Sequence, residues 1–205
     1  MKKIAVFASG SGSDFQSIID ANEREQFCEI ALLIASKDGI FAIERAKKHG
    51  IAYIVRNKKN FVSSEEMFDN IVEELQGRSV DYIVLAGYLN KVGENLVRAF
   101  KDKIINIHPS LIPSFCGKGC YGLNVHRAAL EYGVKISGLT VHFVDEQYDS
   151  GAIILQRAVE VKDDDTPESL QARILEEEHR ALPEAVRLLT TGKIIKNGRK
   201  VTILS

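Results

Sequence analysis

The sequence of 205 residues contains no tryptophan, only three cysteines and four prolines, and no long apolar run. None of its apolar runs approaches the roughly 18 residues that a membrane-spanning helix needs, so we expect no membrane partner. The first run, residues 4–8, ends at Ser9 and is too short for a signal-peptide core. Cys28, Cys116 and Cys120 cannot all pair with one another, which favours reduced thiols and a cytoplasmic location.

The sequence also has no large excess of acidic or basic residues, because its formal net charge is -1. Binding of nucleic acid through general phosphate attraction is therefore not expected. The composition, 45% hydrophobic and 27% charged, is ordinary for a globular protein, and the length suits one core. We predict a single domain over residues 1–205.

The first half alternates short apolar runs with helical patterns. The runs predict strands, and the segments between them predict helices that begin or end at polar caps. Continuous apolar strands separated by helices favour a mostly parallel sheet covered on both faces, a Rossmann-like doubly wound α/β fold. In such folds ligands bind beyond the carboxyl ends of the strands. The predicted strands are 4–8, 30–35, 52–55, 80–86 and 103–107, and the predicted helices are 15–22, 41–49 and 64–75.

The second half has a different pattern, which predicts an antiparallel extension of the sheet. Residues 135–144 and 152–161 form a predicted strand pair joined by an acidic loop. A helix is predicted before this pair, over residues 123–132. Thr166 as N-cap, with Pro167 at the first helical position, begins a helix that extends to about residue 189. A final hairpin is centred on Asn197-Gly198.

A loop rich in glycine and serine, residues 9–13, follows the first predicted strand and precedes the first helix. Backbone amides at such a helix start can hold an anion, although a tight turn that binds nothing is the alternative. Phe15 stands where a dinucleotide fingerprint needs its third glycine, so a single phosphate fits better than NAD or ATP. For Asp14 we expect the backbone amide to contribute and the side chain to turn elsewhere. A bulky residue at Gly12 is expected mainly to raise the apparent KM for the phosphorylated ligand.

Asn106 and His108 lie two residues apart at the end of the fifth predicted strand, so they project from the same face. An amide can donate to a developing oxyanion, and histidine carries protons near neutral pH. A structural role is the alternative for a lone histidine. The loop that joins the later strands offers Asp145, Glu146 and Asp149 as orienting acids, or as a solvated turn. Spacing alone does not choose among them, and the following Ser-Gly weakly favours Asp149.

Several ordered segments together resemble phosphoribosylglycinamide formyltransferases. The block Asn-x-His-Pro-Ser-Leu-x-Pro is specific for folate-dependent formyl-transfer enzymes, and the loop with two glycines narrows the resemblance to members with a phosphoribosyl substrate. The matches span nearly the whole chain. They are residues 8–13, 85–88, 106–113, 140–144, 149–151, 154–156 and 178–179.

This resemblance implies transfer of the formyl group of 10-formyltetrahydrofolate to the amine of glycinamide ribonucleotide, in purine synthesis, without a metal. Asn106, His108 and Asp149 are the implied catalytic residues. Asn106 and protonated His108 would stabilise the tetrahedral oxyanion, while Asp149 would favour the protonated imidazole and assist proton movement. Residues 1–102 would form the phosphate-binding half and residues 103–205 the catalytic and folate-binding half. The family leaves a monomer or a homodimer open.

The resemblance also implies the binding residues. Gly12, Ser13 and Asp14 match phosphate-contacting positions, and Glu178 matches an acid that binds the sugar. Independently, Glu178 interrupts the apolar stripe of its predicted helix, so its carboxylate needs a partner such as a ribose hydroxyl, or a neighbouring basic residue. The implied folate-binding residues are Leu89, Asn90, Lys91, Val92, Asn106, Asp145, Glu146, Gln147, Tyr148 and Asp149.

The chain departs from the family pattern at three places. Leu89-Asn90 replaces a frequent Met-Arg, and no arginine lies near Ser64 or Glu65, which leaves the contacts to the folate tail open. The loop 116–122 is longer than in some relatives and is a candidate cover for the substrate. In that loop Lys118 is a candidate phosphate contact or a solvated lysine. A metal site at Cys116, Cys120 and His126 is an alternative that the loose spacing disfavours.

Three rival interpretations remain. Methionyl-tRNA formyltransferases share the His-Pro-Ser-Leu block but normally carry a further carboxyl-terminal domain. Formyltetrahydrofolate deformylases usually carry an amino-terminal regulatory domain, whereas here the predicted sheet begins at Ile4. A non-catalytic nucleotide-binding module would use the glycine-rich loop without needing Asn106, His108 and Asp149 to converge. Separation of these three side chains by more than about 8 Å from a common point would favour that module.

Overall fold

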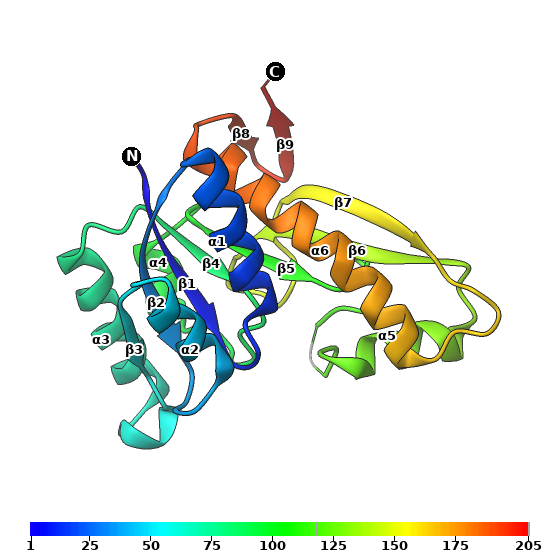
Figure 1. Cartoon of the computed structure of the whole chain (residues 1–205), viewed down its shortest axis with the longest axis horizontal. Helices are drawn as coiled ribbons and strands as arrows, with labels where there is room; N and C mark the ends of the chain where they lie inside the picture. Colours follow the sequence, from blue (N-terminus) through cyan, green and yellow to red (C-terminus); the bar gives the residue numbers. More distant parts are fainter. Residues whose placement is uncertain (118, 205) are drawn as a thin grey trace.

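The computed structural model describes residues 1–117 and 119–204. Seven strands form one sheet in the order β3-β2-β1-β4-β5-β6-β7 (Figure 1). The pairs among β1 to β5 are parallel, and β6 and β7 are antiparallel to their neighbours, which confirms the predicted fold class. The strands are β1 Lys3–Ala8, β2 Glu29–Ala35, β3 Tyr53–Val55, β4 Tyr82–Leu85, β5 Ile104–His108, β6 Ile136–Phe143 and β7 Ile153–Glu160.

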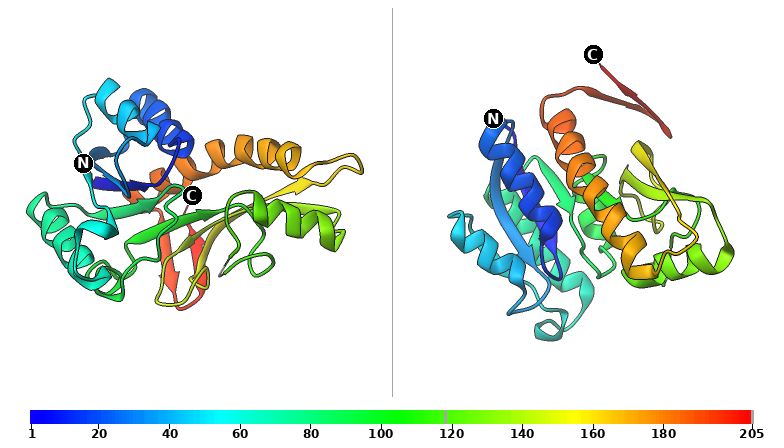
Figure 2. Two further views of the ribbon diagram at one scale, coloured as in Figure 1. Left: turned by 90° about the horizontal axis from the view of Figure 1, so that it is seen from below. Right: turned by 45° about the vertical axis from the view of Figure 1, so that its right-hand side comes forward.

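Side chains alternate across the buried strand β1, and each set belongs to a different hydrophobic core. Ile4 and Val6 pack in the larger core, whereas Ala5 and Phe7 pack in the smaller one. The helices divide in the same way, and Figure 2 shows them on opposite faces of the sheet. The larger core includes α1 Ser13–Glu25, α2 Phe41–Lys48 and α6 Pro167–Thr190, and the smaller includes α3 Ser64–Gly77 and α4 Glu94–Ala99.

Helix α6 begins where the sequence predicts. Thr166 Oγ1 accepts a hydrogen bond from the Ser169 amide at 3.2 Å, and Ser169 Oγ accepts one from the Thr166 amide at 2.9 Å. This reciprocal capping satisfies amides that have no partner within the helix. The helix continues through Pro183 and packs along α1, so the second half of the chain covers one face of the first half (Figure 1).

The remaining elements are short. Helix α5 Leu123–Tyr132 and the hairpin of β8 Ile194–Asn197 and β9 Lys200–Ile203 agree with the predictions. Helix α4 and the 3-10 turn η1 Lys58–Asn60 were not predicted, because so few residues show no clear period. Within residues 1–117 and 119–204, no helix combines the length and apolar character that a membrane crossing requires.

Candidate active site

A cavity of about 480 Å³ opens at the carboxyl ends of the central strands. The strand order reverses between β1 and β4, which is where doubly wound sheets bind ligands. The loops that follow these two strands are joined, because the Ser9 amide donates to the Gly87 carbonyl at 3.1 Å and Ser9 Oγ accepts from the Leu89 amide at 3.0 Å. Residues from the loops after β4 and β6, the end of β5, Gly117, residues 119–122, α1 and α6 complete the lining.

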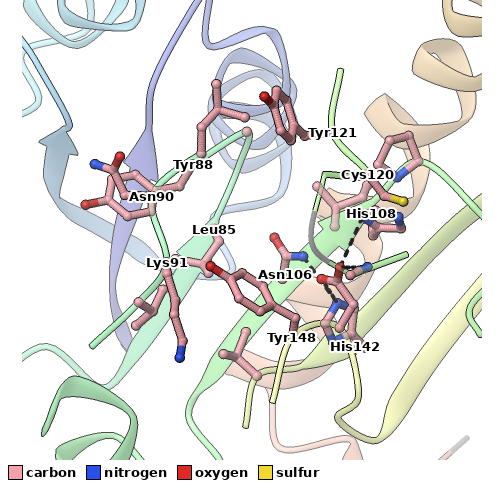
Figure 3. Close-up of a pocket in the computed structure, with 18 of the residues that line it drawn as sticks. Leu85, Tyr88, Asn90, Lys91, Asn106, His108, Cys120, Tyr121, His142 and Tyr148 are labelled. Carbon is pink, nitrogen blue, oxygen red and sulfur yellow. Dashed lines mark hydrogen bonds and ion pairs between the residues drawn. The ribbon is translucent and has the colours of Figure 1, made fainter. Parts of the chain in front are cut away.

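Asn106 and His142 face each other across the antiparallel pair β5 and β6. Nδ1 of His142 lies 2.8 Å from the Phe143 carbonyl oxygen, so this nitrogen carries the proton and donates. Nε2 is then the acceptor for the Asn106 amide, whose Nδ2 lies 3.2 Å away. Burial lowers the pKa of His142, which keeps this ring neutral and the hydrogen bond in place. The amide of Asn106 is thereby oriented and retains a second N–H for a ligand (Figure 3).

His108 is almost completely buried at the end of β5, with oxygen atoms near both ring nitrogens. Nε2 donates to the Phe115 carbonyl at 3.0 Å, and Nδ1 lies 3.9 Å from Oδ2 of Asp149. An imidazolium has a proton on each nitrogen, so it can donate to the Phe115 carbonyl from Nε2 while Nδ1–H faces the Asp149 carboxylate at ion-pair distance.

Asp149 lies between two histidines, since its Oδ1 is 3.7 Å from Nε2 of His142 and its Oδ2 faces His108. The other two acids of the loop are engaged elsewhere. Asp145 accepts from Ser150 Oγ at 2.6 Å, and Glu146 lies 3.6 Å from Arg98 with its side chain 60% exposed. The structure therefore brings Asp149, and not its neighbours, together with Asn106 and His108.

Gly151 explains why the loop can turn Asp149 inward. A Cβ atom at this position would lie 1.7 Å from the Phe143 carbonyl oxygen, so only glycine allows the backbone to approach β6 so closely. Asp149 itself has a left-handed backbone conformation, with φ of 49°. The bend predicted from Ser150-Gly151 therefore depends on the close contact between the backbones of Gly151 and Phe143.

The glycine-rich loop is held by helix α2. Gly12 is the N-cap of α1 with φ of 69°, and a Cβ there would lie 2.7 Å from that of Ala42. Arg45 Nε donates to the Ser11 carbonyl at 2.9 Å. Gly12, as the N-cap, has no side chain that could cap α1, so the first-turn amides, including those of Ser13 and Asp14, are available to an anion.

Asp14 and Glu178 place two carboxyl groups at the α1 and α6 side of the cavity. Oδ1 of Asp14 lies 3.9 Å from Nε2 of His179, and neither atom has a hydrogen-bond partner within the described chain. Burial raises the pKa of Asp14 to about 6, and burial together with the charge of Asp14 raises the pKa of Glu178 well above its usual range. The raised pKa values reduce the negative charge of the pair, which suits a ligand that offers hydroxyl groups.

The predicted folate-binding segments, residues 89–92 and 145–149, both line the cavity. Of the predicted phosphate-binding residues only Asp14 lines it, and Gly12 and Ser13 do not. Lys118 lies outside the described residues. In the part of the chain that is described, no three His, Cys, Asp or Glu side chains are grouped to hold a metal ion.

The comparison with protein families decides the classification. The profile described as formyl transferase matches residues 2–186. This chain belongs to the formyl transferase family. The resemblance found in the sequence is thereby confirmed, and the formyl transferase fold extends from β1 into α6.

Individual formyl transferases are similar over nearly the whole chain. The chain is 40% identical to the phosphoribosylglycinamide formyltransferase of Bacillus subtilis, covering 92% of this chain and 95% of the relative. It is 42% identical to the chloroplastic phosphoribosylglycinamide formyltransferase of Vigna unguiculata, covering 95% of this chain but only 62% of that longer relative. The crystal structure of glycinamide ribonucleotide transformylase 1 from Symbiobacterium toebii superposes with a TM-score of 0.94 at 41% identity, covering 100% and 95% of the two chains.

The role of His142 in this formyl transferase site was missed from the sequence, and His126 was named there only as an alternative metal ligand. His142 contacts both Asn106 and Asp149, and a polar residue inside the apolar run of β6 was the available signal. His126 on α5 is 1% exposed, and burial together with the nearby His108 lowers its pKa to about 4. Its Nδ1 has no partner among the described residues. Nothing in the spacing of α5 distinguishes it from an ordinary core position.

Proposed function

We propose that this formyl transferase transfers the formyl group of 10-formyltetrahydrofolate to the amine of glycinamide ribonucleotide, a step of purine synthesis. The observation that carries the proposal is the cluster of Asn106, His108 and Asp149 at the cavity wall, with Asp14 from the first turn of α1 lining the same cavity. Relatives of this chain at about 40% identity bear the name of this activity. The cytoplasmic location and the monomeric or homodimeric state stay predictions.

We propose that the phosphorylated substrate binds first through its phosphate group. The free first-turn amides of α1 donate hydrogen bonds to the phosphate, because their N–H groups are oriented at the positive end of a helix. Glu178 then meets the sugar hydroxyls, which satisfy a carboxyl group that is only 8% exposed. This placement directs the amine of the glycinamide toward Asn106 and His108.

The transfer is proposed as addition followed by elimination. The substrate amine attacks the formyl carbon, forming a C–N bond, and negative charge develops on the formyl oxygen. The free N–H of Asn106 donates to this oxyanion, which is worth about 3 kcal/mol per donor in comparable sites. The positive charge of the His108 imidazolium stabilises the oxyanion through space. The attacking nitrogen loses a proton, the leaving N10 nitrogen gains one, and the bond from the formyl carbon to N10 breaks. Asp149 balances the charge of His108 throughout.

Incubation of the purified chain with both substrates tests the proposal directly. Formylglycinamide ribonucleotide should appear by mass spectrometry, with tetrahydrofolate in equal amount by absorbance. His108→Ala should lower turnover about 10²- to 10⁴-fold while circular dichroism shows an intact fold. No product from the wild-type chain, or near wild-type turnover by His108→Ala, would overturn the assignment.

A further inference from the structure

Two carbonyl groups of the glycine-rich loop both face helix α2. The Gly10 carbonyl accepts a hydrogen bond from the Ala42 amide at 3.3 Å, and the Ser11 carbonyl accepts one from Arg45 Nε at 2.9 Å. The C=O and the N–H of a trans peptide point in opposite directions, so the amides of Ser11 and Gly12 are directed away from α2. Neither amide donates to another of the described residues. The loop therefore presents consecutive free N–H groups on one side.

This orientation suits an anion. Gly12 has a left-handed backbone conformation, with φ of 69° and ψ of 32°, and such a residue beside helical ones forms a concave set of N–H groups that attracts negative charge. Asp14, in the first turn of α1, is an independent indication of a ligand, because its buried Oδ1 has no hydrogen-bond partner among the described residues. A phosphorylated sugar offers phosphate oxygens to the amides and a hydroxyl group to this carboxyl group.

Arg45 is the side chain that joins α2 to this loop, and it is itself held in place. Its Nη1 donates to Oε1 of Gln16 on α1 at 3.0 Å, and its Cζ lies 4.9 Å from the ring centroid of Phe41. Gln16 donates in turn to Oδ1 of Asp20 at 2.7 Å. One half-buried guanidinium thus holds the loop and α1 together, from a position outside the cavity lining.

The charge of Arg45 is not neutralised by an acid, since no Asp or Glu of the described residues pairs with it. The adjacent Glu44 pairs with Lys47 at 2.8 Å. Burial, and after it the charge of Arg45, lower the pKa of His179, whose Nε2 lies 3.9 Å from Oδ1 of Asp14. The positive charge therefore acts at the same end of α1 as the free amides.

We propose that Arg45 is a positioning residue, which turns the Ser11 carbonyl toward α2 and so directs the Gly12 amide toward the phosphate of the substrate. This inference rests on the proposed function. Because Arg45 acts through the loop and lies outside the cavity lining, its loss should weaken binding of the phosphorylated substrate alone. A lysine at this position keeps the charge and can donate to one carbonyl, but it lacks the rigid fork that holds Ser11 and Gln16 together.

Steady-state kinetics separate this role from a general loss of structure. Arg45→Met should raise the KM for glycinamide ribonucleotide about tenfold, because the amides lose their fixed direction, with kcat and the KM for the formyl folate within about twofold of wild type. Arg45→Lys should restore the KM for glycinamide ribonucleotide to within about threefold of wild type.

Inorganic phosphate provides a second measurement that needs no formyl transfer. Sodium phosphate should raise the melting temperature of the wild-type chain more than sodium chloride of equal ionic strength, because a ligand of the folded state stabilises it. Arg45→Met should lose most of this increase, and Arg45→Lys should retain most of it. If Arg45→Met does not fold by circular dichroism, Gln16→Met replaces it, since this change removes one of the two hydrogen-bond acceptors of Arg45.

Arg24→Met is the matched control, because Arg24 is an exposed arginine in the last turn of α1, far along the helix from the loop. It should change neither KM nor the effect of phosphate. Equal rises in both KM values, an unchanged KM for glycinamide ribonucleotide, or equal stabilisation of wild type and Arg45→Met by phosphate would overturn the role of Arg45. Absence of formyl transfer by a wild-type chain that phosphate still stabilises through Arg45 would instead overturn the proposed function, so the two failures are distinguishable.

Discussion

The Asp149 carboxylate accepts a hydrogen bond of 2.9 Å from the backbone amide of Gly117, and this contact ties the β6–β7 loop to the loop after β5. The bonded oxygen, Oδ2, is the same atom that lies 3.9 Å from Nδ1 of His108. Gly117, which also lines the cavity, therefore fixes the carboxylate that faces the proposed proton carrier. The hydrogen bond thus joins the backbone of Gly117 to the carboxylate of Asp149.

Asp149→Asn separates the hydrogen bond from the charge. An amide oxygen can still accept from Gly117, but the negative charge beside His108 is lost. We expect kcat to fall at least about 100-fold with a small change in KM for either substrate. Steady-state kinetics on the purified variant measure this, with Asp163→Asn, at a 93% exposed position, as the control. A kcat within twofold of wild type would show that the charge is dispensable.

His142 should act through Asn106. Removing the acceptor by His142→Phe frees the amide to rotate, so we expect kcat to fall about tenfold, whereas Asn106→Ala should cost about 10²- to 10³-fold. If the two act as one unit, the double variant will be no slower than Asn106→Ala. Additive losses in this double-mutant cycle would assign His142 an independent role.

Asp14 should make stability depend on pH. Its pKa in the folded chain, about 6, lies above the ordinary value of 3.8, so the folded state binds the proton more tightly than the unfolded state. Stability therefore falls as pH rises from about 4 to 6, and the cost of the buried charge is complete above that range. Asp14→Asn removes a cost of at most about 3 kcal/mol.

Thermal unfolding of Asp14→Asn and wild type at several pH values measures this cost. The variant should match wild type at pH 4 and melt several degrees higher at pH 7.5. Asp163→Asn, at an exposed position, should show no such divergence. A difference in melting temperature that is constant across pH would show that Asp14 does not carry a buried charge.

Gly12 has a structural role that changes the expected effect of substituting it. Because a Cβ would meet Ala42 at 2.7 Å and φ is 69°, Gly12→Ala should destabilise the fold by about 1–3 kcal/mol as well as weakening phosphate binding. Urea unfolding measures the first effect. Adding Ala42→Gly should restore part of the stability by removing the contact. If Ala42→Gly restores no stability, the loss in Gly12→Ala comes from backbone strain alone.

The sequence by itself determined the sheet and its major helices. Continuous apolar runs such as 30–35 can be buried on both faces only within a covered sheet, and the residues Thr166 and Pro167 specify a helix start through local hydrogen bonds. The family motif also marked Asn106 and His108, because neighbours on one strand face share a direction whatever the rest of the fold does. These features depend on the geometry of residues close together in the chain, so the order of residues in the sequence is enough to predict them.

Only the tertiary structure decided which groups meet across elements. The choice of Asp149 over Asp145 depends on the contact of Gly151 with Phe143, and the role of His142 depends on the register of β6 against β5. The proximity of Lys91 to Tyr148 likewise joins two loops far apart in the chain. Such contacts follow from how the sheet twists and how loops pack on it, and spacing along the chain contains no record of either.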